Sequence, residues 1–241
     1  MSKFWELIEF EPKLIQISYS DNKPLYDLVT HAWEKFIAPN YFEGFGYDAT
    51  YLLLYKTQAD VALKRAVSSV LTKEYAQAVY NLRIAVENMQ IAIYAYENPV
   101  EISKLFSETD DTDRKIKKAS IKFMVENLST ASDRFKALHK ECDRFGSHQT
   151  IAHHSSYVSF GDGNKNIKIN YIGENREELN VGLVGITIGC MIEFHNVIET
   201  LPTKEWVILN SSNKEIFDDI SQQFEQLKIN YIPMFRKHGV I

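Results

Sequence analysis

Apolar residues recur at helical spacing along most of this chain. The clearest case is the segment 72–96, where Thr72 and Glu74 predict a helix start and Pro99 follows its end. Its apolar positions keep the i, i+3, i+4 spacing of a helix with one buried face: Val79, Leu82, Val86, Met89 and Ile93. Similar spacing predicts helices over 25–38, 48–71, 112–127 and 130–145, and a last helix that opens with a capping box of Ser212 and Glu215.

The segment 179–192 is apolar on every side and carries three glycines at helical spacing. It is too short for a membrane span, which needs about 20 apolar residues, and it ends at Glu193. We therefore expect a central helix buried inside a bundle. Each glycine costs about 1 kcal/mol of helix propensity relative to alanine, so we expect a close contact with a second helix at Gly185 and Gly189.

Short alternating segments predict a small amount of sheet. The sequences YVSF and IKINYI flank the glycine-rich turn GDGNKN, which predicts a β-hairpin over 156–172. The segment WVIL is expected to add a third strand beside it. The first 45 residues are mixed in character. The predicted fold is mainly α: one domain, 1–241, made of about five to seven helices, with an irregular N-terminal extension (1–45) and the hairpin inserted before the glycine helix.

Composition and motif content exclude several classes of function but do not identify one. The 241 residues carry a net charge of −5, so any site for nucleic acid or an anionic lipid has to be a local positive patch. The beginning of the chain contains Glu6, Glu9 and Glu11 where a signal peptide needs an apolar run, and two cysteines do not make a disulfide framework. We expect a cytoplasmic protein without a membrane partner. Walker A, GxGxxG, GxSxG and zinc-finger patterns are absent.

Three of the seven histidines lie in the segment 143–156, between a predicted helix and the hairpin. They do not form the HxH, HxxxH or HExxH patterns typical of metal sites, so neither a metal nor another cofactor is expected. Two interpretations stay open: a loop whose imidazoles bond backbone carbonyls, and a loop that binds a ligand or a metal with help from Glu87 or Glu193. The candidate binding residues of this loop are Ser147, His148, His153 and His154.

Arg83 and Glu87 are the second candidate site. They are four residues apart on the 72–96 helix, a spacing at which an arginine and a glutamate form an ion pair along the helix surface. We expect Glu87 to receive a hydrogen bond from His148 or His153, because the loop begins after Gly146 at the end of the bundle. A plain surface ion pair is the alternative.

The layout of these motifs resembles that of a known superfamily. An apolar helix of the form L-R-x-x-x-E (Leu82, Arg83, Glu87) precedes further helices, a loop with Ser147, His148 and His153, a hairpin and an apolar helix. Over residues 48–201 this arrangement is similar to uncharacterised bacterial proteins related to the HEPN (higher eukaryote and prokaryote nucleotide-binding) and abortive-infection superfamily. The resemblance implies a helical module of bacterial defence or RNA-linked stress, non-catalytic or weakly catalytic, acting as a homodimer with RNA or a protein as partner.

Catalytic members of that superfamily cleave RNA without a metal, using an arginine and a histidine with four to six residues between them. One such spacing exists in this chain, from Arg134 to His139. Residues five apart on a helix lie about 140° from one another, so the pair is expected to flank opposite edges of the apolar face formed by Phe135, Leu138 and Cys142. A metal-dependent or small-molecule-binding protein built on the histidine loop 147–154 is the alternative function.

Overall fold

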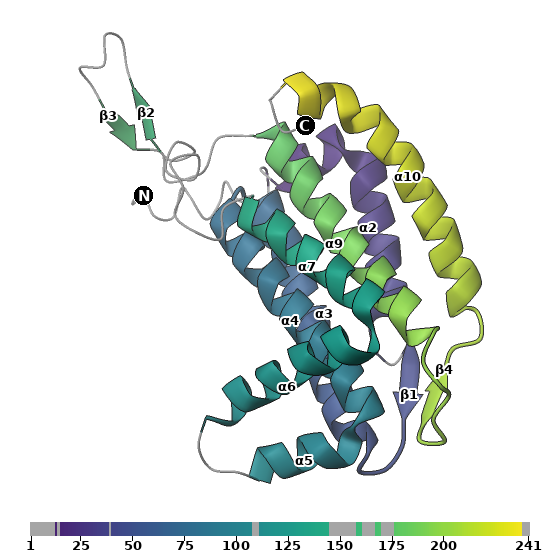
Figure 1. The fold of residues 1–241 in the computed structure, drawn as a ribbon. Coiled ribbons are helices and arrows are strands. Elements are labelled where there is room, and N and C mark those ends of the chain that lie inside the picture. The colour runs from purple at the N-terminus through teal and green to yellow at the C-terminus, as the bar shows by residue number, and fades with distance from the viewer. Residues whose placement is uncertain are drawn as a thin grey trace.

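The computed structural model describes residues 13, 15–38, 40–107, 111–144, 158–160, 167–169 and 176–237. The fold is mainly α with a small β-hairpin, as the hydrophobic pattern predicted (Figure 1). Its helices are α2 (Lys23–Phe36), α3 (Ala49–Leu71), α4 (Tyr75–Glu97), α5 (Pro99–Ser107), α6 (Thr112–Asn127), α7 (Ser129–Arg144), α9 (Glu177–Ile198) and α10 (Asn213–Lys237). The segment α5 was not predicted, because nine residues contain too few turns for a clear period.

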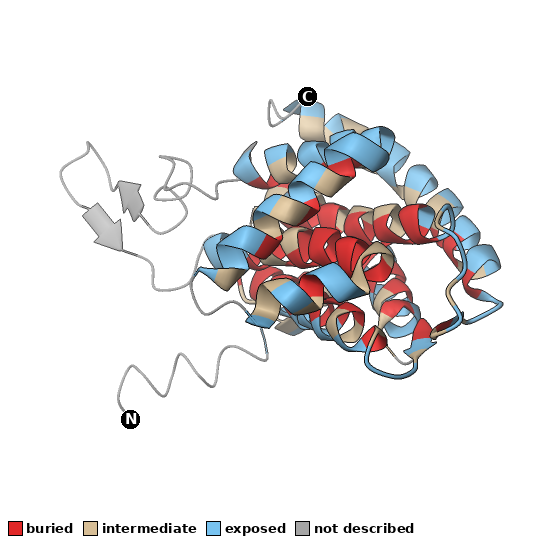
Figure 2. Cartoon of the chain, turned by 60° about the horizontal axis from the view of Figure 1, so that its bottom comes forward, coloured by how far each residue is buried: buried red, intermediate tan, exposed pale blue. Residues whose placement is uncertain are grey.

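Helix α9 is the centre of the bundle. It contacts α2, α3, α4, α7 and α10, and these helices turn their buried residues toward it (Figure 2). Among the described residues it is the one helix long and apolar enough to span a membrane, but 67% of its most apolar window is buried inside the bundle. The expectation of a buried central helix is confirmed, and the arrangement is compatible with a soluble protein.

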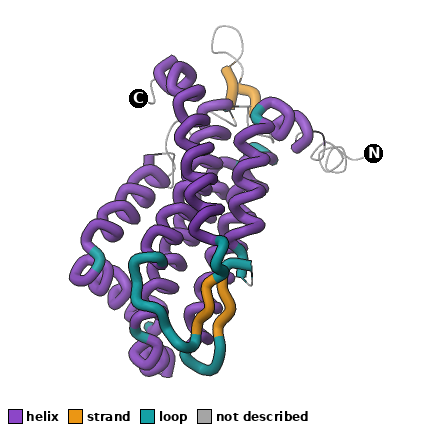
Figure 3. The backbone as a smooth tube through the Cα atoms, turned by 90° about the vertical axis from the view of Figure 1, so that its right-hand side faces the viewer, coloured by secondary structure: helices purple, strands orange, loops and turns teal. Residues whose placement is uncertain are grey.

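The two short sheets differ from the prediction in one respect. The hairpin is confirmed: β2 (Val158–Phe160) pairs antiparallel with β3 (Ile167–Ile169). However, the WVIL segment does not join it. Strand β4 (Val207–Leu209) instead pairs antiparallel with β1 (Phe42–Gly44), at the opposite end of the bundle (Figures 1 and 3). Residues 42–44 belong to the region expected to be irregular, because three residues are too few to show an alternating pattern.

The N-terminal region belongs to the bundle. The predicted helix 25–38 is present as α2, and it packs against α9 and α10. Residues 23–44 therefore contribute core helix and strand, which corrects the description of 1–45 as an irregular extension. Residues 1–12 lie outside the described part of the chain.

A buried lysine joins helices α2 and α3 near β1. The Lys56 ammonium lies 2.6 Å from Asp60 Oδ1 and donates a hydrogen bond to the Phe36 carbonyl at the end of α2. It also lies 3.5 Å from the centroid of the Phe36 ring, in a cation–π contact. Because Lys56 is fully buried, its pKa falls to about 8, although Asp60 opposes that change. The pair holds α3 to the C-terminal end of α2.

We predict that Asp60→Asn destabilises the protein by about 3–5 kcal/mol, because it leaves a buried ammonium without its counter-charge. The double variant Lys56→Met/Asp60→Leu should recover most of this stability, because it removes both charges. The free energy of unfolding in urea would be measured. Asp27→Asn is the matched control: Lys23 and Asp27 have the same i, i+4 spacing but lie in solvent, so this change should have a far smaller effect. Equal destabilisation by Asp60→Asn and Asp27→Asn would contradict the prediction.

Candidate functional site

The predicted ion pair on α4 is present. Arg83 Nε lies 3.6 Å from Glu87 Oε1, and both side chains point outward from a helix that is otherwise mostly buried. The Arg83 side chain is 39% exposed and that of Glu87 is 23% exposed. The pair is therefore neither in the core nor freely solvated.

Two neighbouring helices add charged groups to this pair. Lys117 of α6 lies 2.6 Å from Glu87 Oε1. Asp143, near the end of α7, accepts a hydrogen bond of 3.4 Å from Arg83 Nη1. These contacts form because α4 packs against both α6 and α7, which also pack against each other.

His139 of α7 is half-buried and lies within electrostatic range of the same charged groups. Burial lowers the pKa of His139 below its ordinary value of 6.5, and the positive charges of Arg83 and Lys117 act in the same direction. The negative charges of Glu87 and Asp143 oppose the shift. We call Arg83, Glu87, Lys117, His139 and Asp143 the His139 cluster.

The His139 cluster combines three chemical capacities. At neutral pH the imidazole of His139 is uncharged, so it can accept a proton or a hydrogen bond. Arg83 and Lys117 supply N–H donors for an anion, and both keep part of their side chain in solvent. Glu87 orients both cations. Such a set can bind a phosphate or another oxyanion close to an acid–base group.

The sequence analysis singled out Arg83, Glu87 and His139, but it did not predict that they lie together or that Lys117 and Asp143 join them. Arg83 and Glu87 were expected to meet the histidine loop, whereas the histidine brought toward them in the described structure is His139. Ser147, His148, His153 and His154 lie outside the described residues, so their expected bond with Glu87 stays a prediction. The helical pattern could show that His139 lies off the Phe135 face, but not which helix it would meet.

Arg134 and His139 have different charged neighbours in the described chain. The Arg134 guanidinium contacts Glu193 of α9 at 3.1 Å, while His139 faces α4 and α6. Their separation on opposite edges of the apolar face of α7 agrees with the angle of about 140° expected for five residues. Phe135 and Cys142 of that face are fully buried.

Metal and thiol chemistry find no support in the part of the chain that the structure describes. No group of three histidine, cysteine, aspartate or glutamate side chains is placed there to hold a metal ion. Both cysteines are free and buried, and burial raises the pKa of Cys142 to about 12. These thiols are therefore protonated at neutral pH and poor nucleophiles.

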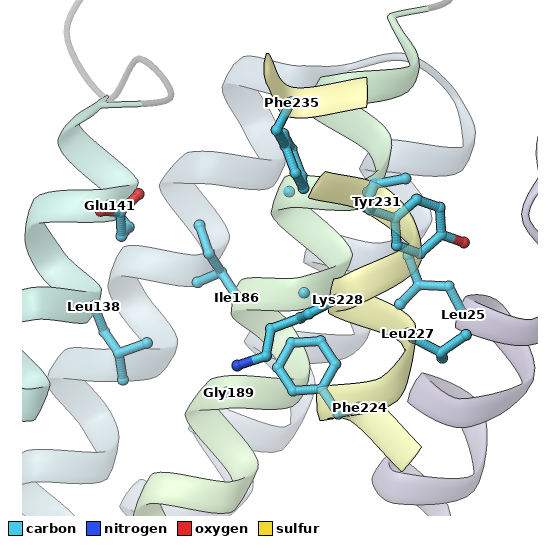
Figure 4. A pocket seen from close by; sticks show the side chains of 13 residues that line it. Leu25, Leu138, Glu141, Ile186, Gly189, Phe224, Leu227, Lys228, Tyr231 and Phe235 are labelled. Carbon is cyan, nitrogen blue, oxygen red and sulfur yellow. The ribbon is translucent and has the colours of Figure 1, made fainter. Parts of the chain in front are cut away.

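The glycine face of α9 borders an apolar cavity of about 310 Å³ (Figure 4). Leu138 of α7 lines one side of it and Phe224 of α10 the other. A Cβ atom added to Gly185 would meet the Phe224 ring at 3.5 Å, and one added to Gly189 would meet Leu138 at 3.7 Å. These are ordinary van der Waals distances. Within this chain the nearest groups to the two glycines are the side chains of Phe224 and Leu138, not the backbone of a second helix. The expected close helix–helix contact is therefore not formed within the chain.

Comparison with known proteins gave no match to a protein-family model, a curated protein or a solved structure.

We predict that Gly185→Ala raises the free energy of unfolding by about 0.5–1 kcal/mol, because alanine favours the helix and its methyl group fits the cavity. The measurement is urea unfolding. Gly46→Ala is the control with the opposite sign: Gly46 has φ = +72°, a conformation that costs alanine about 1–2 kcal/mol. A decrease in stability in Gly185→Ala would show that α9 needs the glycine for packing after all.

We predict that His139→Gln flattens the decline in stability on acidification. The unfolded imidazole takes up a proton near pH 6.5, whereas the folded one does so at lower pH. Below pH 6.5 the unfolded state therefore binds more protons, and folding weakens as the pH falls. Wild type and His139→Gln should differ most between pH 7 and about pH 5 in urea unfolding. His31→Gln, at an exposed histidine of α2, should keep the wild-type profile; the prediction fails if His139→Gln keeps it too.

Proposed function

We propose that this chain is a HEPN-like helical module that binds RNA, in bacterial defence or RNA-linked stress. The supporting observation is the distribution of charge. Helices α6 and α7 together contain nine basic and five acidic residues, a net charge of +4, although the whole chain carries −5. The remaining residues therefore carry −9. A polyanion is attracted to these two helices and repelled by the rest of the molecule.

The basic residues are arranged for contact with a strand. Arg114, Lys118 and Lys122 of α6 are exposed and spaced four residues apart, so they follow one side of the helix. Lys117, from the same helix, reaches into the His139 cluster. A phosphate backbone lying along α6 would pass next to Arg83 and His139. We call the exposed row of Arg114, Lys118 and Lys122 the α6 basic row.

The geometry favours binding over efficient cleavage. Arg134, the arginine of the superfamily's catalytic spacing, is paired with Glu193. Arg83 and Lys117 could place a phosphate near His139, but each is paired with a carboxylate. We therefore propose weak or absent cleavage. The homodimer expected from the resemblance is part of this proposal and calls for a measurement of mass in solution.

We predict that the triple variant Arg114→Gln/Lys118→Gln/Lys122→Gln binds single-stranded RNA about 10-fold or more weakly at low salt. Each phosphate-binding charge that the variant removes should lower the slope of log Kd against log salt concentration by about 0.7, because the protein then neutralises one phosphate fewer on the RNA. Fluorescence anisotropy with a labelled RNA measures both quantities. The same samples, kept in EDTA and run on a gel, report cleavage.

The control variant Lys35→Gln/Lys214→Gln/Lys237→Gln removes three exposed charges from α2 and α10. It should keep wild-type affinity and slope. Absence of RNA binding by the wild type at low salt, or equal weakening in both triple variants, would overturn the proposed function. Robust cleavage that is abolished in His139→Gln would replace the binding proposal with an enzymatic one.

A further inference from the structure

The cavity beside the glycine face of α9 has an almost entirely apolar lining (Figure 4). Ten of its thirteen lining residues are glycines or carry aliphatic or phenyl side chains, and the lining comes from α2, α7, α9 and α10. Its volume of about 310 Å³ lies at the lower end of the range for small-molecule sites. Protein interiors contain few voids larger than a water molecule, so this space beside the central helix is a candidate ligand site.

Water is a poor occupant of this cavity. A buried water molecule needs about two to four polar partners, whereas an apolar cavity of about 150 Å³ stays dry and binds benzene. Only Glu141, Lys228 and Tyr231 bring polar side-chain atoms to the lining, and Figure 4 shows the Tyr231 hydroxyl directed away from α7. The lining therefore favours a ligand with an apolar body.

Helix α10 encloses the cavity incompletely. Phe217 and Ile220 in its first half are buried, whereas the apolar residues of its second half, such as Phe224 and Phe235, are only half-buried. Helices α7 and α10 both pack on α9, and the cavity lies between them. An apolar chain held between α7 and α10 would remove this remaining surface from water, which is the main driving force for such binding.

Lys228 supplies a positive charge at this cavity. Its ammonium lies 5.1 Å from the centroid of the Phe224 ring, and Figure 4 shows it extending from α10 toward α7. Its ion-pair partner Glu225 is 64% exposed, so this pair is of the surface kind that contributes little. A ligand carboxylate can therefore contact the ammonium without disrupting a strong interaction. The acidic lining residue, Glu141, lies about one turn beyond Leu138 on α7, whereas the ammonium lies at the level of Leu138 (Figure 4).

We infer that this cavity binds a fatty acid, as a free carboxylate with an acyl chain of about ten to twelve carbon atoms. The length follows from the volume, because about 150 Å³ holds the six carbon atoms of benzene. The chain would lie along Gly182, Gly185 and Gly189, where no side chains occupy the space, and the carboxylate would contact Lys228. This role also explains why α9 contains three glycines despite their low helix propensity. The inference does not depend on RNA binding.

The test measures binding of hexanoate, octanoate, decanoate and dodecanoate to the full chain by isothermal titration calorimetry, below the concentrations at which these acids form micelles. The Kd should fall about 4-fold for each added methylene group, because each one transfers further apolar surface from water. The gain should level off at about ten to twelve carbon atoms, when the chain fills the cavity.

Two substitutions at Gly185 test the position of the chain. Gly185→Leu places its side chain in the cavity and should weaken decanoate binding by about 10-fold or more, and Gly185→Ala should weaken it about 4-fold. The alanine variant is predicted to be more stable than the wild type, so its loss of affinity cannot come from unfolding. Asn196→Leu is the matched control, because it adds the same side chain at an exposed position of α9 outside the lining.

Lys228→Met tests the position of the carboxylate. It keeps an unbranched side chain over Phe224 but removes the charge, so it should weaken decanoate binding about 2- to 5-fold and leave the binding of decanol unchanged. Lys214→Met, at an exposed lysine of α10 outside the lining, should bind decanoate like the wild type.

Absence of saturable decanoate binding by the wild type, or equal affinity in the wild type and both Gly185 variants, overturns the site. Binding that depends on chain length and on Gly185, but not on Lys228, overturns the fatty-acid assignment and makes the occupant a neutral apolar molecule.

Discussion

The whole structure depends on the burial of one helix. Helix α9 is apolar on nearly every side, so it is stable only when other helices remove its surface from water. Five helices do so, and two of them, α2 and α10, come from the two ends of the described chain. The start of α9 is fixed by a polar contact: the Tyr75 hydroxyl donates to Asn180 and accepts from the Arg176 amide. This contact sets the position of α9 against α4.

Enclosing α9 decides where polar chemistry can lie. Helix α4 is buried over most of its length between α3 and α9, and its charged residues Arg83 and Glu87 meet α6 and α7. Helix α6 makes no contact with α9 among the principal helix pairs and has just three buried residues, so it can carry a dense positive charge without desolvation. Helix α6 supplies the positive charge, and the buried helix α4 fixes the position of the residues that contact it.

The sequence predicted these elements better than their pairing. The long helices follow from apolar period and capping residues, and the Arg83–Glu87 pair follows from a spacing of four on one helix. These features are local. The pairing of β1 with β4 joins residues far apart in the chain, such as Phe42 and Leu209, through three-residue strands, and no local pattern encodes it. The meeting of His139 with Arg83 depends likewise on the rotation of α7 against α4, which is set by packing of the complete bundle.

The division of roles on α7 follows from the same geometry. A helix with its apolar face against α9 and α4 has two polar edges, and each edge meets a different neighbour. Arg134 lies on the edge toward α9 and pairs with Glu193, while His139 lies on the edge toward α4 and α6. A sequence motif that joins the two therefore links residues with different environments. The residues that can act together are those on one edge, whatever their distance in sequence, and on this edge they are His139, Arg83 and Lys117.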